Sequence, residues 1–143
     1  MATGDIGEVE YLTLLVNTPV PRDYPAKHLG KRTDKRLLVR DFMVRVVMED
    51  GTKFLINVPR GYVIDGSTIP RVLHRAWHPF VTEAYWASVI HDYIYSDLYH
   101  RFTKAFADNL LKFMIRRDGG SWALSNIFYT GVRMNFKGGG WGR

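Results

Sequence analysis

The sequence predicts an α+β domain, in which a small antiparallel sheet from the N-terminal half packs against three to four helices from the C-terminal half. Three observations predict this class. Short runs in the first half are rich in β-branched residues, and apolar positions partly alternate around Val39–Val47. The Asp50-Gly51 pair between two such runs is typical of a hairpin turn. In the second half the apolar residues recur at helical spacing instead.

The strands are expected before residue 65. Prolines in the stretch 19–25 deny ladder donors and restrain the preceding residues, so this stretch is predicted to be an irregular, extended link. The predicted strands are Val9–Val16, Arg36–Met48, Thr52–Val58 and Tyr62–Ile64.

The helices are expected after residue 65, and the first, second and fourth begin at a hydroxyl side chain that can accept from a free backbone N–H group. Pro79 ends the first helix and the Asp118-Gly119-Gly120 run ends the third. Four helices are predicted: one from Ser67 or Thr68 to about Trp77, one that starts at Thr82 and includes His91, one over Thr103–Arg117, and one from Ser121 to about Asn135.

A chain of 143 residues is long enough for one domain with a proper core. We expect an extended N-terminal segment with one strand over residues 1–35, a single α+β domain over 36–136 and a flexible Gly-rich tail over 137–143. Trp141 in that tail has no local core, so we expect it to fold back on the domain or to enter a partner.

The composition narrows the functional classes. The chain has 46% hydrophobic residues and no cysteine, which predicts a globular protein and excludes disulfides and thiolate metal sites. No apolar run approaches the ~18 residues of a membrane span, and the acidic N-terminus predicts no signal peptide. The net charge of +6 favours acidic partners, but the cations are mostly scattered, so specific nucleic-acid binding is not expected.

The pair His91-Asp92 is the most informative local feature. It lies in a run, EAYWASVIHDYIYSDLY, that is otherwise too apolar and aromatic to face water on all sides. A carboxylate held there has to be paired, hydrogen-bonded or metal-bound, because an isolated buried charge is too costly. Asp65 precedes a helix start and is expected to point toward this pair. His74 and His78 have the i, i+4 spacing of two metal ligands, although Pro79 disfavours helical geometry at His78.

Asp108 has a different sequence context. On the predicted third helix it lies opposite the apolar positions Phe106 and Leu110, with Lys104 and Lys112 at i−4 and i+4. This pattern predicts a solvated face with ion pairs unless a tertiary partner covers that side. The sequence contains no P-loop, no nucleophile elbow, no Rossmann glycine pattern and no His-Glu-x-x-His motif.

Several of these segments together resemble a known family. The segment Asp65-Gly-Ser-Thr-Ile-Pro-Arg71 is followed by His91-Asp-Tyr-Ile-Tyr95, by Arg101 with Ala107-Asp108, and by Tyr129 with Val132-Arg133. This order is similar to a family of small phage and prophage proteins of uncharacterised function, over roughly Arg36 to Trp141. The resemblance implies that Asp108 meets Arg101 or His91 across a helix pair. It places these residues in the family pattern: Asp65, Ser67, Pro70, His91, Asp92, Tyr95, Arg101 and Asp108.

Two hypotheses of different classes follow, and the sequence leaves open whether the protein is an enzyme. The first is a phage virion component of the tail, baseplate or neck, made in the host cytoplasm. It would act by contacts with other phage structural proteins in an oligomeric assembly, with the Asp and His side chains forming a buried polar network.

The second hypothesis is a metal-dependent hydrolase acting on phosphoesters or cell-wall peptide. His91, Asp92, Asp65 and Asp108 would bind one divalent ion, which lowers the pKa of a bound water toward ~7. His91, Asp92 and Asp65 would then be the candidate catalytic residues. A third hypothesis, an accessory protein that holds nucleic acid through its cations, predicts binding that weakens steeply with salt.

Overall fold

The computed structural model describes residues 5–21, 36–64, 85–119 and 122–133. The larger sheet contains β1 (Ile6–Tyr11), β4 (Phe42–Met48) and β5 (Lys53–Val58) in the antiparallel order β1-β4-β5. Asp50 and Gly51 turn the chain between β4 and β5, and Gly51 has the positive φ of +90° that this turn requires. Few residues other than glycine adopt this conformation without strain. The hairpin that the Asp50-Gly51 pair predicts is present.

A second, smaller sheet contains β2 (Asn17–Pro19), β3 (Arg36–Leu38) and β6 (Val63–Ile64), in the order β2-β3-β6. The predicted strand Arg36–Met48 is thus two strands in different sheets. At the break, residues 39–41, the Val39 N–H donates to the Val16 carbonyl at 3.0 Å. The Asp41 carboxylate accepts from the backbone N–H of Arg60 at 2.8 Å, so the chain exchanges strand partners here for a contact with the loop after β5.

The N-terminal segment contributes two strands where one was predicted, and its first strand begins at Ile6 rather than Val9. The backbone there alternates an exposed Glu8 and a half-buried Glu10 with a buried Val9 and a half-buried Tyr11. This alternation is what a strand with one wet face requires. β1 pairs along β4, so this part of the segment belongs to the main sheet.

The described helices are α1 (Tyr85–Asp97), α2 (Lys104–Arg117) and α3 (Trp122–Arg133). The predicted helix Thr103–Arg117 is α2. Thr103 caps it, since its hydroxyl accepts from the backbone N–H of Phe106 at 3.0 Å, and Gly119 with φ +93° follows the end of the helix. The α+β class is confirmed. None of the described helices is long and apolar enough to cross a bilayer. The predicted helix from Ser67 or Thr68 to Trp77 and the caps Thr82 and Ser121 lie outside the described residues.

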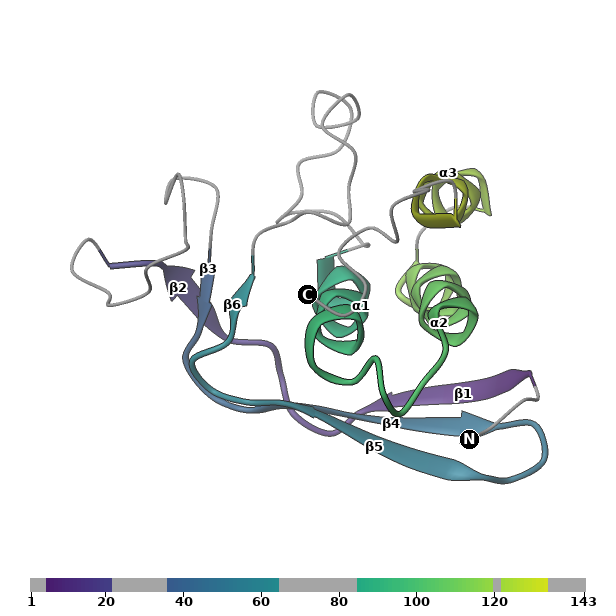
Figure 1. Cartoon of the computed structure of the whole chain (residues 1–143), viewed down its shortest axis with the longest axis horizontal. Coiled ribbons are helices and arrows are strands. Elements are labelled where there is room, and N and C mark those ends of the chain that lie inside the picture. The colour runs from purple at the N-terminus through teal and green to yellow at the C-terminus, as the bar shows by residue number, and fades with distance from the viewer. Residues whose placement is uncertain (1–4, 22–35, 65–84, 120–121, 134–143) are drawn as a thin grey trace.

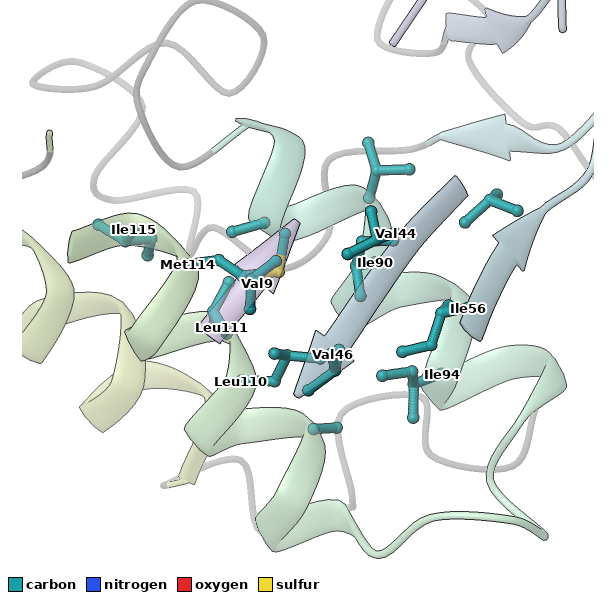
Figure 2. Close-up of a cluster of buried hydrophobic side chains, with 14 of the residues drawn as sticks. Val9, Val44, Val46, Ile56, Ile90, Ile94, Leu110, Leu111, Met114 and Ile115 are labelled. Carbon is teal, nitrogen blue, oxygen red and sulfur yellow. The ribbon is translucent and has the colours of Figure 1, made fainter. Parts of the chain in front are cut away.

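The elements form layers. Figure 1 shows α1 and α2 side by side over one face of the β1-β4-β5 sheet, with α3 against α2 on the side away from the sheet. The core fills the space between the sheet and the first two helices, as Figure 2 shows. Its labelled side chains are Val9, Val44, Val46 and Ile56 from the sheet, Ile90 and Ile94 from α1, and Leu110, Leu111, Met114 and Ile115 from α2.

A polar contact joins β1 to the end of α2. The Tyr11 hydroxyl donates to Asp118 Oδ2 at 2.5 Å, and the Arg117 guanidinium lies over the Tyr11 ring at 4.9 Å while its Nε donates to the Val9 carbonyl at 2.6 Å. Burial and then the Asp118 hydrogen bond raise the pKa of Tyr11, so the phenol stays protonated and remains a donor.

Tyr11→Phe tests this contact. Removing the hydroxyl leaves the partly buried Asp118 carboxylate without its donor from the sheet, and we expect the free energy of unfolding to fall by ~1–2 kcal/mol. Urea unfolding of the full chain measures the change. Tyr129→Phe is the matched control, because Lys112 contacts Tyr129 through its ring, and the substitution keeps that ring. Equal stability of Tyr11→Phe and wild type would contradict the assigned contact.

Candidate functional site

His91 of α1 and Asp108 of α2 meet between the two helices. The Nε2 atom of His91 lies 2.7 Å from Asp108 Oδ1. His91 is 3% exposed and Asp108 is 0% exposed, so the pair is inside the protein. A titratable pair at this depth has to be satisfied by further hydrogen bonds, since neither charge is solvated by bulk water.

Asp108 receives those further bonds from all three helices. The Tyr95 hydroxyl donates to Oδ1 at 2.5 Å, while Lys104 Nζ and an Arg133 guanidinium nitrogen donate to Oδ2 at 2.9 Å and 3.1 Å. Together with His91, each carboxylate oxygen has two partners. We call these five residues the Asp108 network: His91, Tyr95, Lys104, Asp108 and Arg133.

The helical period brings the members together. His91 and Tyr95 are four residues apart on α1, and Lys104 and Asp108 are four apart on α2, so each pair lies on one side of its helix. Lys104 Nζ also donates to the carbonyl of Val132 at 2.9 Å, near the end of α3. A cation at a helix C-terminus satisfies an orphan carbonyl and favours the local dipole, so Lys104 ties α3 to α2.

The network sets the charge states of its members. Burial alone would raise the pKa of Asp108, but hydrogen bonds from His91, Tyr95 and Lys104 outweigh it and hold that pKa below its ordinary value. Burial alone would lower the pKa of His91, but the hydrogen bond to Asp108 and the charges of Asp108 and Asp92 raise it above the ordinary value. Burial and the Asp108 bond raise the pKa of Tyr95, so the phenol stays neutral and donates.

Asp92 is buried beside this network, with 3% of its surface exposed. Its Oδ1 lies 3.9 Å from His91 Nδ1, and after Asp108 this carboxylate is the next cause of the raised pKa of His91. His91 is thus set between two carboxylates, one on its own helix and one on α2. The inward orientation that the sequence predicts for His91 and Asp92 is present.

The expectation of a solvated Asp108 is wrong. Lys104 at i−4 does pair with it, as expected, but Lys112 at i+4 lies over the Tyr129 ring at 4.3 Å instead. The reason is tertiary: α3 covers the side of α2 that a single-helix pattern leaves to solvent. Of the two partners that the resemblance implies for Asp108, His91 is present, whereas Arg101 is exposed and lies over the Phe102 ring.

The other predicted site residues are not placed. Asp65, His74 and His78 lie outside the described residues. In the part of the chain that the structure describes, no three His, Asp or Glu side chains are grouped so that they could hold a metal ion. The metal set of His91, Asp92, Asp65 and Asp108 therefore stays a prediction that depends on Asp65.

Sequence reasoning missed the donors of the network. In the sequence, Tyr95 and Arg133 stand out only as parts of the family pattern, and Lys104 only as an ion-pair partner on a solvated face. The i, i+4 spacings of His91 with Tyr95 and of Lys104 with Asp108 are the signal that could have found two of the contacts.

Asp108→Asn tests whether the network carries stability. Loss of the negative charge leaves two cations and the imidazole around a neutral amide, and we expect the free energy of unfolding to fall by ~3–5 kcal/mol, as when one partner of a buried pair is removed. Chemical unfolding of the full chain measures it. Asp97→Asn is the matched control, because Asp97 is exposed on α1 and should change stability by less than ~0.5 kcal/mol. A small loss in Asp108→Asn would mean that the network contributes little.

The pH dependence of stability has a definite sign. Because the folded pKa of His91 lies above its ordinary 6.5, its stabilising contribution is complete below pH 6.5 and is lost as the pH rises through the folded pKa. Because the folded pKa of Asp108 lies below 3.8, its contribution is present above pH 3.8 and is lost as the pH falls through the folded pKa.

His91→Gln should therefore destabilise the protein more at about pH 5.5 than at about pH 9. Urea unfolding of the variant and the wild type at both pH values gives the two differences. In an Asp108→Asn background the same substitution should show a much smaller pH dependence, because its main partner has lost its charge. A larger effect of His91→Gln at the higher pH would contradict the assigned charge state.

The comparison with known proteins bears on the family alone. No curated protein and no solved structure matches the chain. The family described as a protein of unknown function, DUF1353, matches residues 39–132, a stretch that contains β4, β5, α1, α2 and most of α3. The Asp108 network lies within this stretch except for Arg133, which is the next residue. The chain belongs to the DUF1353 family.

Proposed function

We propose that this protein is a structural component of a phage virion, in the tail, baseplate or neck, and that it acts through contacts with other phage proteins. The proposal draws on the resemblance of the Asp65–Arg71 and His91–Tyr95 segments to small phage and prophage proteins. In this account the protein is made in the host cytoplasm and ends in an oligomeric assembly. Its polar centre serves to hold the helices in one arrangement.

The closed Asp108 network is the observation that carries the proposal. A catalytic acid, base or nucleophile has to reach a substrate atom, directly or through one water. His91 is 3% exposed and its Nε2 is bonded to Asp108, whose two oxygens already have four donors among the described residues. A network whose central carboxylate is fully buried and has donors on both oxygens specifies packing, which is what a scaffold needs.

The surface offers apolar side chains for protein contacts. Trp122 at the start of α3 is 71% exposed and Leu14, between β1 and β2, is 63% exposed. Aromatic residues are enriched at interfaces, where they bury large areas at low entropic cost. These positions are the candidates for contacts inside a particle.

Mass spectrometry of purified particles tests the proposal. Particles produced by the genome that encodes this chain should contain it at a fixed copy number relative to the major capsid protein. An abundant host enzyme should be depleted from the same preparation, which controls for carry-over. The proposal fails if the chain stays with the soluble lysate and is depleted from the particles as strongly as the host enzyme.

The metal-dependent hydrolase is the alternative, and one observation favours it: His91 lies within reach of two carboxylates, at 2.7 Å from Asp108 and 3.9 Å from that of Asp92. It has less support, because Lys104 and Arg133 already bind Asp108 Oδ2 and a divalent ion there would meet two cations. Elemental analysis of protein purified without chelator separates the two functions. Stoichiometric zinc, manganese or iron that is lost in Asp92→Asn would favour the hydrolase.

A further inference from the structure

The two edge strands of the β1-β4-β5 sheet differ in whether their outward backbone groups have hydrogen-bond partners among the described residues. At the β1 edge, the Val9 carbonyl accepts from Arg117 Nε at 2.6 Å, so a side chain of α2 covers it. At the β5 edge, no described residue donates to or accepts from the outward backbone groups. Figure 1 shows β5 as the rim of the sheet, with no other described element beyond it.

The hydrogen-bond pattern identifies the outward groups. Met48 N–H donates to the Thr52 carbonyl at 2.8 Å, which makes these two an opposed, bonded pair. Bonded and non-bonded pairs alternate along an antiparallel ladder, so Phe54, Ile56 and Val58 direct their backbone groups to β4. The N–H and C=O groups of Lys53, Leu55 and Asn57 therefore point away from the sheet. A bond on the other side of β4 agrees with this assignment. The Leu12 N–H donates to the Met43 carbonyl at 2.9 Å, so Met43, which lies opposite Asn57, directs its backbone groups toward the β1 side and not toward β5.

The side chains of the same three residues are exposed and alternate along β5 with the buried Ile56 and Val58, so they lie on the sheet face away from the core, and Leu55 at the centre is 50% exposed. A row of unpaired donors and acceptors with an apolar residue at its middle is a template for another strand. Two antiparallel copies of β5 can hydrogen-bond to each other, because the outward N–H and C=O groups are spaced symmetrically about Leu55.

We infer that β5 pairs with β5 of a second copy of this chain, antiparallel and with Leu55 on the twofold axis, so that two three-stranded sheets become one continuous sheet. In this register the leucines lie opposite each other, and their backbone groups form a bonded pair. Lys53 then lies opposite the partner's Asn57, and the same holds in reverse. Opposed side chains of this kind stabilise antiparallel strand pairs.

The charges favour this register over the one centred on Lys53. Asn57 Nδ2 donates to Asp41 Oδ2 at 3.4 Å, so a carboxylate lies beside the position that the partner's Lys53 would occupy. A register centred on Lys53 would instead place two ammonium groups opposite each other, which is unfavourable. Lysine on an edge strand commonly blocks pairing, but here it meets an amide and a nearby carboxylate.

Sedimentation velocity of the full chain over a range of concentrations tests the inference. Wild type should show a reversible monomer–dimer equilibrium. Leu55→Lys, which brings two like charges to the twofold axis, should raise the dimer dissociation constant at least ~10-fold, a change of about 1.4 kcal/mol. Leu14→Lys is the matched control, because Leu14 is also exposed but lies outside β5 and should leave the equilibrium unchanged. Wild type that stays monomeric, or a dimer that Leu55→Lys does not weaken, would overturn the inference.

A second measurement does not need the charged variant to fold. The chain has no cysteine, so Leu55→Cys introduces a single thiol at the proposed axis. Mild oxidation should give a covalent dimer of Leu55→Cys far faster than of Leu14→Cys. Equal rates for the two variants would contradict the pairing. The inference does not rest on the virion role, since a monomeric chain could still be found in particles and a β5 dimer could be absent from them.

Discussion

The arrangement of the helices depends on one buried carboxylate. Asp108 accepts from α1 through His91 and Tyr95, from its own helix through Lys104, and from α3 through Arg133. Three of these donors are cationic or become so on protonation, which compensates the loss of hydration at a residue with no exposed surface. Since a carboxylate has two oxygens in one plane, it can hold these donors only when the helices are at the right distance. Apolar packing alone allows many arrangements, and a satisfied polar network selects one.

The Asp108 network also explains why His91, the most informative residue of the sequence, is enclosed among the described residues. His91 and Asp92 would suggest chemistry if they faced a cleft. Instead the imidazole is occupied by Asp108, and Lys104 extends the network to the carbonyl of Val132. The sheet is joined to this helical layer separately, through Tyr11, Arg117 and Asp118. Together these contacts join the described sheet and helices at two separate polar centres.

Much of the fold follows from local sequence signals. Asp50-Gly51 marks the hairpin because few other pairs adopt its backbone angles, and Thr103 with Gly119 marks both ends of α2. The inward position of His91 also follows from the apolar run around it. The position of Asp108 does not, because its burial depends on α3, the next helix, packing back against α2, which the pattern of a single helix does not reveal. The division of Arg36–Met48 into two strands is likewise tertiary, since it depends on Asp41 binding the loop at Arg60.

The ionisation of the Asp108 carboxyl tests the central claim most directly. A carbon-13 NMR titration of the aspartate side chains, assigned with Asp108→Asn, gives its pKa in the folded protein. If hydrogen bonds from His91, Tyr95 and Lys104 outweigh burial, the Asp108 signal will titrate below the ordinary value of 3.8, or the protein will unfold in acid before the signal moves. A titration at or above 3.8 in the folded state would show that burial dominates, and that the carboxylate does not hold the three helices together.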